Sequence, residues 1–268
     1  MKRNYEQNKV VKHMKFTMNG KRLKEKINIC LLKGKYNQGM VSTKSQLGNE
    51  IKITTDEQGV GIENADSSTY IRVIETVSNE AIQEGGSVFV NAETMCKYLL
   101  DERTTFTLKE GVLLMSYGTS VVQIPCIERH GFSHVMGRFK SMNNVDSSQT
   151  ELQVTEKLLL KTRAVVNKQD MINAMNMAEK VGNSIYTIRV KAGGDMLISS
   201  DRDSQMFSSR LNTIEEVTRD AIACISLPLG KALEQSTDDE VVVYYDDDMP
   251  FVFKTNDITI MRAPRLEV

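Results

Sequence analysis

Apolar and polar residues alternate in short runs that predict strands, and these runs recur in the same order along the chain. The later series contains an apolar run, a short helical segment and three strands, at 223–227, 228–235, 241–245, 249–253 and 258–261. The earlier series has the same order, at 87–90, 91–101, 104–108, 112–115 and 119–124. Ser87 matches Ala223 and Thr104 matches Glu240, both at an offset of 136 residues. A fixed offset over several elements indicates an internal repeat.

The pattern that precedes these series is also duplicated. A strand at 13–18 leads to Asn19, which can cap a helix that runs to about Leu32, and a strand at 152–162 leads to Asn167, which can cap a helix that ends at Lys180. Each helix has one apolar stripe with the spacing of a buried face, namely Leu23, Ile27, Cys30 and Leu31 in the first and Met171, Ala174, Met175 and Ala178 in the second. Further strands are expected at 51–54, 60–63, 69–77, 186–190, 196–200 and 205–211.

Many strands and few helices predict an α+β fold with antiparallel sheets that helices cover on one face. The chain has 268 residues, which is enough for two domains of ordinary size. We expect a disordered leader over 1–12, a first domain over 13–126, an interdomain linker over 127–150 and a second domain over 151–268. The linker segment is too long for an ordinary connection inside one compact domain.

Composition predicts a protein that can bury a substantial core, since 40% of its residues are hydrophobic and its net charge is −1. No apolar run is long enough for a membrane span, and the first residues lack the apolar region of a signal peptide. The four cysteines are scattered in apolar surroundings, which is typical of reduced core residues. These features predict a cytoplasmic protein with reduced cysteines.

Charge is unevenly distributed along the chain. Residues 1–35 contain eleven Lys or Arg and two acids, whereas residues 238–248 contain six acids and no base. A strongly basic segment in a nearly neutral chain favours contact with a polyanion on one face. A solvated tail is the alternative for residues 1–12.

The sequence offers little for catalysis, so we expect no enzyme and no cofactor. It has three histidines and lacks a Gly-rich phosphate loop and a nucleophile elbow. Cys126, His130 and His134 have spacings compatible with zinc, but a fourth ligand is missing, and we predict no metal site. The run Asp246–Asp248 is expected to be a solvated turn.

Several short stretches resemble the DNA sliding clamps, the family that includes proliferating cell nuclear antigen and the bacterial beta clamp. Met14–Thr17 before a helix is similar to the opening of bacterial clamps. Gly61–Thr69, Ile225–Leu227, Asp248–Phe253 and Ala263–Pro264 are similar to eukaryotic ones. The resemblance extends from Met14 to Leu266, and its specificity lies in the order and spacing of the pieces. The mixture of features favours a divergent member, such as a viral or plasmid-borne one.

The resemblance implies a polymerase processivity factor that encircles duplex DNA without reading its sequence. Helices would line the hole, sheets would lie outside, and a chain of two domains would form a homotrimer. The implied phosphate contacts are basic residues on the four predicted helices, namely Lys21, Arg22, Lys26, Lys33, Lys97, Lys168, Lys180 and Lys231. The alternative interpretation is that these basic residues lie on polar helix faces and contribute only to solubility.

Subunit contacts and partner contacts also follow from the resemblance. The strand near 119–124 would pair with a neighbour's strand near 205–211, through Thr119, Val121, Gln123, Gln205, Phe207 and Ser209. A pocket for partner peptides would include Tyr70, Phe132, Val135, Pro250, Ala263 and Pro264. The implied partners are double-stranded DNA, a DNA polymerase, a clamp loader and further copies of the chain. The alternative is a clamp-like adaptor, monomeric or part of a heteromer, that forms no closed homo-ring.

Overall fold

The structure is a computed structural model that describes residues 13–32, 49–65, 68–127, 148–182, 185–202, 204–226 and 229–264. The chain divides into two compact units, each assembled from separate segments. Unit 1 comprises residues 1–25, 49–62 and 74–130, and unit 2 comprises residues 26–48, 63–73 and 131–268. The chain passes from one unit to the other within α1 (Gly20–Cys30), β3 (Gly59–Ala65) and β4 (Thr69–Glu75).

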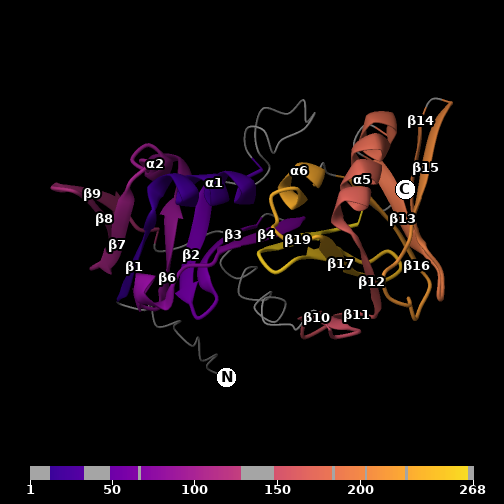
Figure 1. The fold of residues 1–268 in the computed structure, drawn as a ribbon, viewed down its shortest axis with the longest axis horizontal. Helices are drawn as coiled ribbons and strands as arrows, with labels where there is room; N and C mark the ends of the chain where they lie inside the picture. Colours follow the sequence, from indigo (N-terminus) through magenta and orange to yellow (C-terminus); the bar gives the residue numbers. More distant parts are fainter. Residues whose placement is uncertain are drawn as a thin grey trace, which may run out of the picture. The chain divides into compact units, whose positions relative to one another are not determined.

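Unit 1 contains a five-stranded antiparallel sheet in the order β5-β1-β7-β8-β9 (Figure 1). Its strands are β5 (Ile82–Glu84), β1 (Met14–Asn19), β7 (Arg103–Lys109), β8 (Val112–Tyr117) and β9 (Ser120–Pro125). A second group places β2 (Glu50–Asp56) between β6 (Gly86–Asn91) and β3. The helices of this part are the first turns of α1, the short 3₁₀ helix η2 (Asn79–Ala81) and α2 (Ala92–Cys96).

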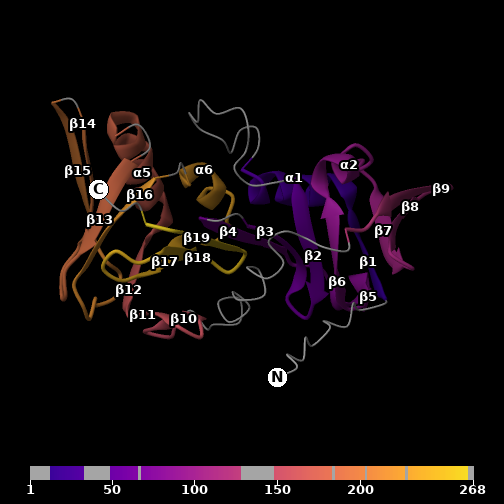
Figure 2. The same ribbon diagram turned by 180° about the vertical axis from the view of Figure 1, so that it is seen from behind.

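The described part of unit 2 contains two larger antiparallel sheets and one two-stranded sheet. In one, the order is β12-β17-β18-β19-β4, with β12 (Thr162–Asn167), β17 (Glu240–Tyr245), β18 (Phe251–Lys254) and β19 (Ile258–Arg262). In the other, the order is β15-β14-β13-β16, with β15 (Gln205–Leu211), β14 (Met196–Arg202), β13 (Ile185–Val190) and β16 (Ala221–Ser226). Two short strands, β10 (Leu152–Thr155) and β11 (Leu158–Leu160), form a hairpin. Helix α5 (Lys168–Gly182) packs on the β13–β15 sheet beside α6 (Gly230–Leu233), as both views show (Figures 1 and 2).

Alternation of apolar and polar residues explains which side of each sheet is buried. In β1, Met14, Phe16 and Met18 are buried while Lys15 is exposed. Phe16 stacks on Phe106 of β7 with 4.6 Å between ring centroids. Strands buried on both faces, such as β17, instead have continuous apolar runs. Burial of these side chains provides the main driving force for each unit.

The internal repeat predicted from the sequence reappears in the structure, but the strand registers match Thr104 with Val241 and not with Glu240. Met14–Asn19 of β1 and Thr162–Asn167 of β12 are both six residues long and each precedes a helix, at an offset of 148 residues. Thr69–Glu75 of β4 and Gln205–Leu211 of β15 are both seven residues long, at an offset of 136. The predicted α+β class with antiparallel sheets is confirmed.

Two of the predicted helices are shorter in the structure. The helix expected over 91–101 ends at Cys96, where the N–H of Tyr98 bonds to the carbonyl oxygen of Met95 and closes a tight turn. The helix expected over 228–235 spans only Gly230–Leu233. Among the described residues, no helix is long and apolar enough to cross a membrane.

Candidate nucleic-acid interface and unpaired sheet edges

The start of α1 is fixed by local hydrogen bonds and by close packing. The side-chain oxygen of Asn19 accepts a hydrogen bond from the N–H of Arg22 at 3.1 Å, so Asn19 caps the helix as predicted. The N–H of Gly20 bonds to the carbonyl oxygen of Glu102 at 2.9 Å. A Cβ atom at Gly20 would lie 2.5 Å from the carbonyl oxygen of Leu100, so only glycine permits this approach. The two basic side chains that follow therefore have a rigid base.

Both of these side chains are paired with acids from distant parts of the sequence. Lys21 Nζ lies 3.1 Å from Asp101 Oδ2, and Arg22 Nη1 lies 3.3 Å from Glu75 Oε1. Asn19 Nδ2 donates a second hydrogen bond to Asp101 Oδ1 at 3.1 Å. Hydrogen bonds from Asn19 and Lys21 lower the pKa of the Asp101 carboxyl, and Asp101 raises the pKa of Lys21.

An open groove in unit 1 gathers these groups. It is lined by β1, the first turn of α1, the end of β4 and the segment before β7. Its charged residues are Lys21, Arg22 and Arg103 on the basic side and Glu25, Glu75 and Asp101 on the acidic side. The groove is therefore electrically balanced, although it carries two of the cations that were predicted to meet DNA.

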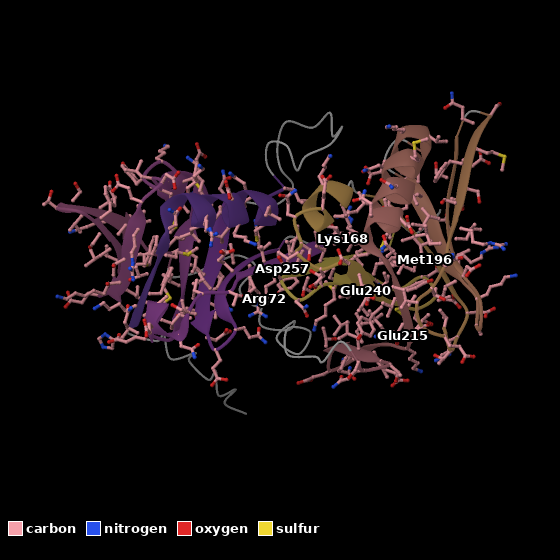
Figure 3. All side chains as sticks on the ribbon, viewed as in Figure 1. Arg72, Lys168, Met196, Glu215, Glu240 and Asp257 are labelled. Carbon is pink, nitrogen blue, oxygen red and sulfur yellow. The ribbon has the colours of Figure 1, made fainter. Side chains whose placement is uncertain are left out.

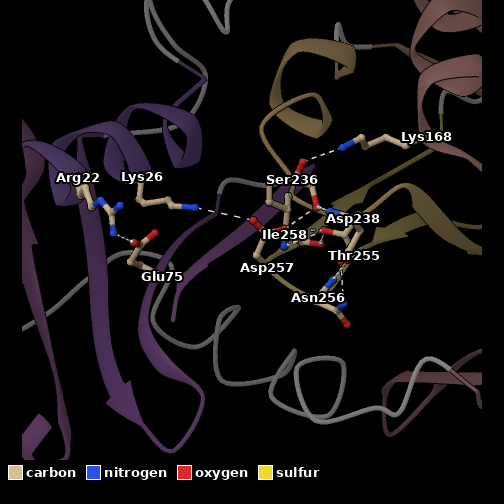
Figure 4. Close-up of polar contacts among 10 residues, drawn as sticks. All are labelled: Arg22, Lys26, Glu75, Lys168, Ser236, Asp238, Thr255, Asn256, Asp257 and Ile258. Carbon is tan, nitrogen blue, oxygen red and sulfur yellow. Dashed lines mark hydrogen bonds and ion pairs between the residues drawn. The ribbon is translucent and has the colours of Figure 1, made fainter. Parts of the chain in front are cut away.

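Lys26 and Lys168 belong to a polar network inside unit 2 (Figure 4). Lys26 Nζ lies 3.8 Å from Asp257 Oδ2, and both side chains are largely buried. Asp257 Oδ1 accepts a hydrogen bond from Ser236 Oγ at 2.6 Å, and Lys168 Nζ donates to the carbonyl oxygen of Ser236 at 2.7 Å. Figure 3 places Lys168 and Asp257 in the same part of the unit. These two predicted phosphate contacts thus have partners within unit 2 in this structure.

The remaining predicted cations lie apart from this network. Lys231 pairs with Glu234 one turn along, at 3.1 Å. Lys97 and Lys180 are exposed, and Lys33 lies outside the described residues. The structure therefore brings Lys21 and Arg22 together in one groove and distributes the others.

The predicted pocket residues are described only in part. Tyr70 is fully buried and its hydroxyl donates to Glu63 Oε2 at 3.2 Å. Pro250, Ala263 and Pro264 are half-buried, and the N–H of Ala263 bonds to the carbonyl oxygen of Ser68 at 2.8 Å. Phe132 and Val135 lie outside the described residues.

The two strands predicted to join subunits are both edge strands. In the described part of the chain, β9 pairs only with β8 and β15 pairs only with β14. Figures 1 and 2 show each of them as the last strand of its sheet. Their outer faces carry exposed apolar side chains, Val121 at 60% and Met206 at 81% exposure. A groove beside β15 is lined by Met177 of α5 and Phe207.

One carboxyl group in unit 2 is buried without a full set of partners. Burial raises the pKa of Glu179 on α5 to about 7, against the opposing effect of a hydrogen bond from the backbone of Leu229. Its Oε1 has no hydrogen-bond partner within the described segments. The Tyr186 hydroxyl, also orphaned there, has a pKa raised by burial and by the nearby Glu179 charge.

Sequence reasoning missed the acidic partners Asp101, Glu75 and Asp257. The sequence does indicate a need for acidic partners such as Asp101 and Glu75, because the first turn of α1 contains cations and no acid. The prediction that Cys126, His130 and His134 hold no zinc stays a prediction, since His130 and His134 lie outside the described residues. In the described part of the chain, no group of three or more His, Cys, Asp or Glu could hold a metal ion.

Solved structures with similar folds cover nearly the whole chain. No protein-family model matches the sequence, and no curated protein matches it. PCNA from A. fulgidus, in a complex with the C-terminal region of FEN-1, has a TM-score of 0.64 and 14% identity over 95% of this chain and 99% of its own. PCNA from Thermococcus kodakaraensis has a TM-score of 0.58 and 12% identity over 94% and 100%. The DNA polymerase III beta subunit from Thermotoga maritima has a TM-score of 0.65 and 15% identity over 94% of this chain but only 64% of its own length.

These similarities confirm, at the level of the fold, the resemblance that the sequence motifs indicated. Both PCNA chains are matched over almost their full length, whereas the beta subunit is matched over about two thirds. The chain therefore has the fold of the DNA sliding clamps.

Proposed function

We propose that the chain is the subunit of a sliding clamp, a closed homo-ring that encircles duplex DNA and tethers a DNA polymerase and other replication proteins. It would act as a processivity factor without catalysis. Support comes from the clamp fold over nearly the whole chain and from one feature of this molecule, the relation between its internal strand pairing and its two unpaired edges.

The internal pairing joins the two repeats. β4 of the first repeat pairs with β19 of the second, with Ile258 opposite Val73, Ile260 opposite Ile71 and Arg262 opposite Thr69. Both partners of these pairs lie in unit 2. The chain thus contains one complete example of a joint between repeats.

The offsets between the two repeats predict how β9 of one copy would pair with β15 of another. β4 corresponds to β15, so that Ile71 matches Phe207. Following the registers from β1 to β9 and from β12 to β19 matches Ser120 with Ile258 and Val122 with Ile260. A joint between copies would therefore place Val122 opposite Phe207.

The same register sets the whole contact. Ser120 would lie opposite Ser209, and Ile124 opposite Gln205. Ile124 is buried in β9, and Val122 lies on the same face of that strand, because side chains alternate along a strand. Phe207 likewise points toward α5, since it lines the groove beside that helix. In this register the buried face of β9 continues into the face of β15 that points toward α5. A slip of one residue would place the exposed face of β9 there instead.

Burial supports the same assignment. Tyr70 of β4 is fully buried, whereas its repeat counterpart on β15, Met206, is 81% exposed. Ile29 of α1 is buried, whereas its counterpart on α5, Met177, is 46% exposed. Met206 and Met177 lie on opposite faces of the β15 edge, since Phe207 points toward α5 and Met206 away from it. A neighbouring β9 would extend both faces and satisfy the unpaired backbone groups of two edge strands, which are otherwise a liability. Two repeats in each chain and six in a ring give a trimer.

Native mass and DNA retention test this function together. We expect a mass of three chains and retention on closed circular DNA at salt concentrations that release an ordinary phosphate-binding protein, with loss when the DNA is cut. A native mass of one chain at micromolar concentration would overturn the homo-ring and favour the adaptor alternative. Equal salt sensitivity on circular and cut DNA would overturn encirclement.

A further inference from the structure

The cations in the first turn of α1 are placed against the preference of the helix itself. The N-terminal end of a helix favours acids and disfavours cations, because the backbone dipole is positive there. The first turn of α5 follows this preference with Asp170, but the matching position of α1 is Arg22 and the neighbouring position is Lys21. Helix stability therefore does not account for these two side chains.

Acids from elsewhere in unit 1 compensate for them. Asp101 lies after α2 and Glu75 ends β4, and both reach the groove at the start of α1. The Lys21 and Asp101 side chains are 60% and 65% exposed, and Arg22 is 71% exposed. Glu75, the partner of Arg22, is only 15% exposed, so only the Lys21–Asp101 pair is exposed at both ends. An exposed pair is weak, so Lys21 can exchange Asp101 for another anion at low cost.

The local geometry allows Lys21 to change partner without loss of the helix start. Asn19 holds Asp101 through its Nδ2 atom and caps the N–H of Arg22 through its Oδ1 atom. Asp101 is thus kept in place by an uncharged donor when Lys21 leaves. The cap of α1 likewise does not depend on either ion pair.

Resting on the proposed function, we propose that this groove is the phosphate contact of α1 and that it works by exchange. Asp101 holds Lys21 in the absence of DNA, and a backbone phosphate of the duplex replaces Asp101 when DNA is present. Each phosphate contact is then offset by the loss of a carboxylate contact. Such compensation keeps the net affinity low, and low affinity suits a protein that must move along DNA.

A double-mutant cycle on the assembled protein tests the exchange. The probe is a short blunt-ended linear duplex at low ionic strength, titrated against wild-type protein, D101N, K21Q and K21Q/D101N. We expect D101N to bind the duplex about two- to fivefold more tightly, as expected from the strength of an exposed pair. We expect D101N to have no effect in the K21Q background, because the released cation is then missing.

A matched variant separates exchange from a general change of charge. Glu57 is exposed in the turn between β2 and β3, so E57Q changes the net charge by the same amount away from the groove. Equal affinities of D101N and E57Q, or an effect of D101N that persists without Lys21, would overturn the exchange. Retention of the wild-type protein on circular DNA, measured in parallel, tells the two failures apart. If the wild-type protein is retained on circular DNA but D101N has no effect, only the exchange is overturned. If the wild-type protein is not retained, the clamp function itself is overturned.

Discussion

Helices α1 and α5 occupy the same place in the two repeats, yet their exposed faces have opposite characters. Where α1 has Lys21 and Arg22, α5 has Gln169 and Asp170. Where α1 has the buried Ile29, α5 has the exposed Met177. Duplication therefore preserved the buried stripes that make each helix pack, while the outward positions diverged.

This difference suggests a division of labour between the repeats. Under the proposed function, Lys21 and Arg22 of the first repeat would contact DNA, whereas the second repeat has an exposed apolar surface beside an edge strand. The internal joint is closed by an ion pair between Lys26 and Asp257, whose repeat counterparts are Ala174 and Thr119. A joint between copies would lack this pair and rest on backbone pairing and apolar contact.

Charge on the β9 edge should have the largest effect. V122K places an ammonium group opposite Phe207 of the neighbouring β15, on the face that the joint would bury, and its desolvation should prevent pairing. We expect complete conversion to single chains by analytical ultracentrifugation. Q83K, on the opposite edge of the same sheet, serves as the control and should leave the assembly intact. An unchanged trimer in V122K would remove β9 from the interface.

The register of this joint can be tested more sharply by cross-linking. Residues directly opposite in an antiparallel pair have Cα atoms about 4.5–5.5 Å apart, which is within the range of a disulfide. We expect S120C/S209C to form covalent trimers on oxidation, and S120C/S208C to form them poorly. Efficient cross-linking by the second variant would mean that the internal joint is not the template for the outer one.

The Glu179 carboxyl should make the stability of unit 2 depend on pH. Its pKa is raised in the fold from 4.5 to about 7, so the folded state binds the proton more tightly than the unfolded state. The contribution of the Glu179 carboxyl to the stability of unit 2 is therefore largest below about pH 4.5, and it is lost as the pH rises through about 7. The full shift corresponds to about 3 kcal/mol.

Substitution by Gln should remove this dependence. We expect E179Q to exceed the wild-type protein in stability by up to about 3 kcal/mol at pH 8 and to match it near pH 4.5. The measurement is urea unfolding at fixed protein concentration across this range. E216Q, at an exposed site in the same unit, provides the control. A pH profile that E179Q leaves unchanged would contradict the assignment.

Local patterns predicted the helices and the repeat but not the partners of charged side chains. The stripe of Leu23 and Ile27 and the cap at Asn19 depend on neighbours within one helical turn, and the structure has them as expected. The pairs of Lys21 with Asp101 and Lys26 with Asp257 join residues far apart in sequence, which periodicity cannot identify. The sequence pattern also could not predict that Met177 and Met206 are exposed, because an apolar residue in a strand or helix is usually assigned to the core.

Removal of the α1 cations should weaken DNA binding more than an equal change elsewhere. We expect K21Q/R22Q to lower the log–log salt slope by up to roughly 1.8, since each phosphate contact contributes roughly 0.9. Lys157 and Lys191 are exposed in turns of unit 2, so K157Q/K191Q changes the charge equally and should have little effect. Titration of a duplex over a range of salt concentrations gives both slopes. Equal slopes for the two variants would show that DNA contact is not concentrated on the first repeat.

The internal ion pair should have the smallest effect, on stability alone. Lys26 and Asp257 are mostly buried but lie 3.8 Å apart, and Asp257 also accepts hydrogen bonds from Ser236 and Thr255. K26M keeps most of the apolar stem and removes the charge, so we expect a loss of about 1 kcal/mol in urea unfolding. Asp257 keeps its hydroxyl partners in this variant, which limits the cost of the unpaired carboxylate. If the joint instead depends on this pair, K26M should lose several times that amount, and D257N in the K26M background should restore much of it.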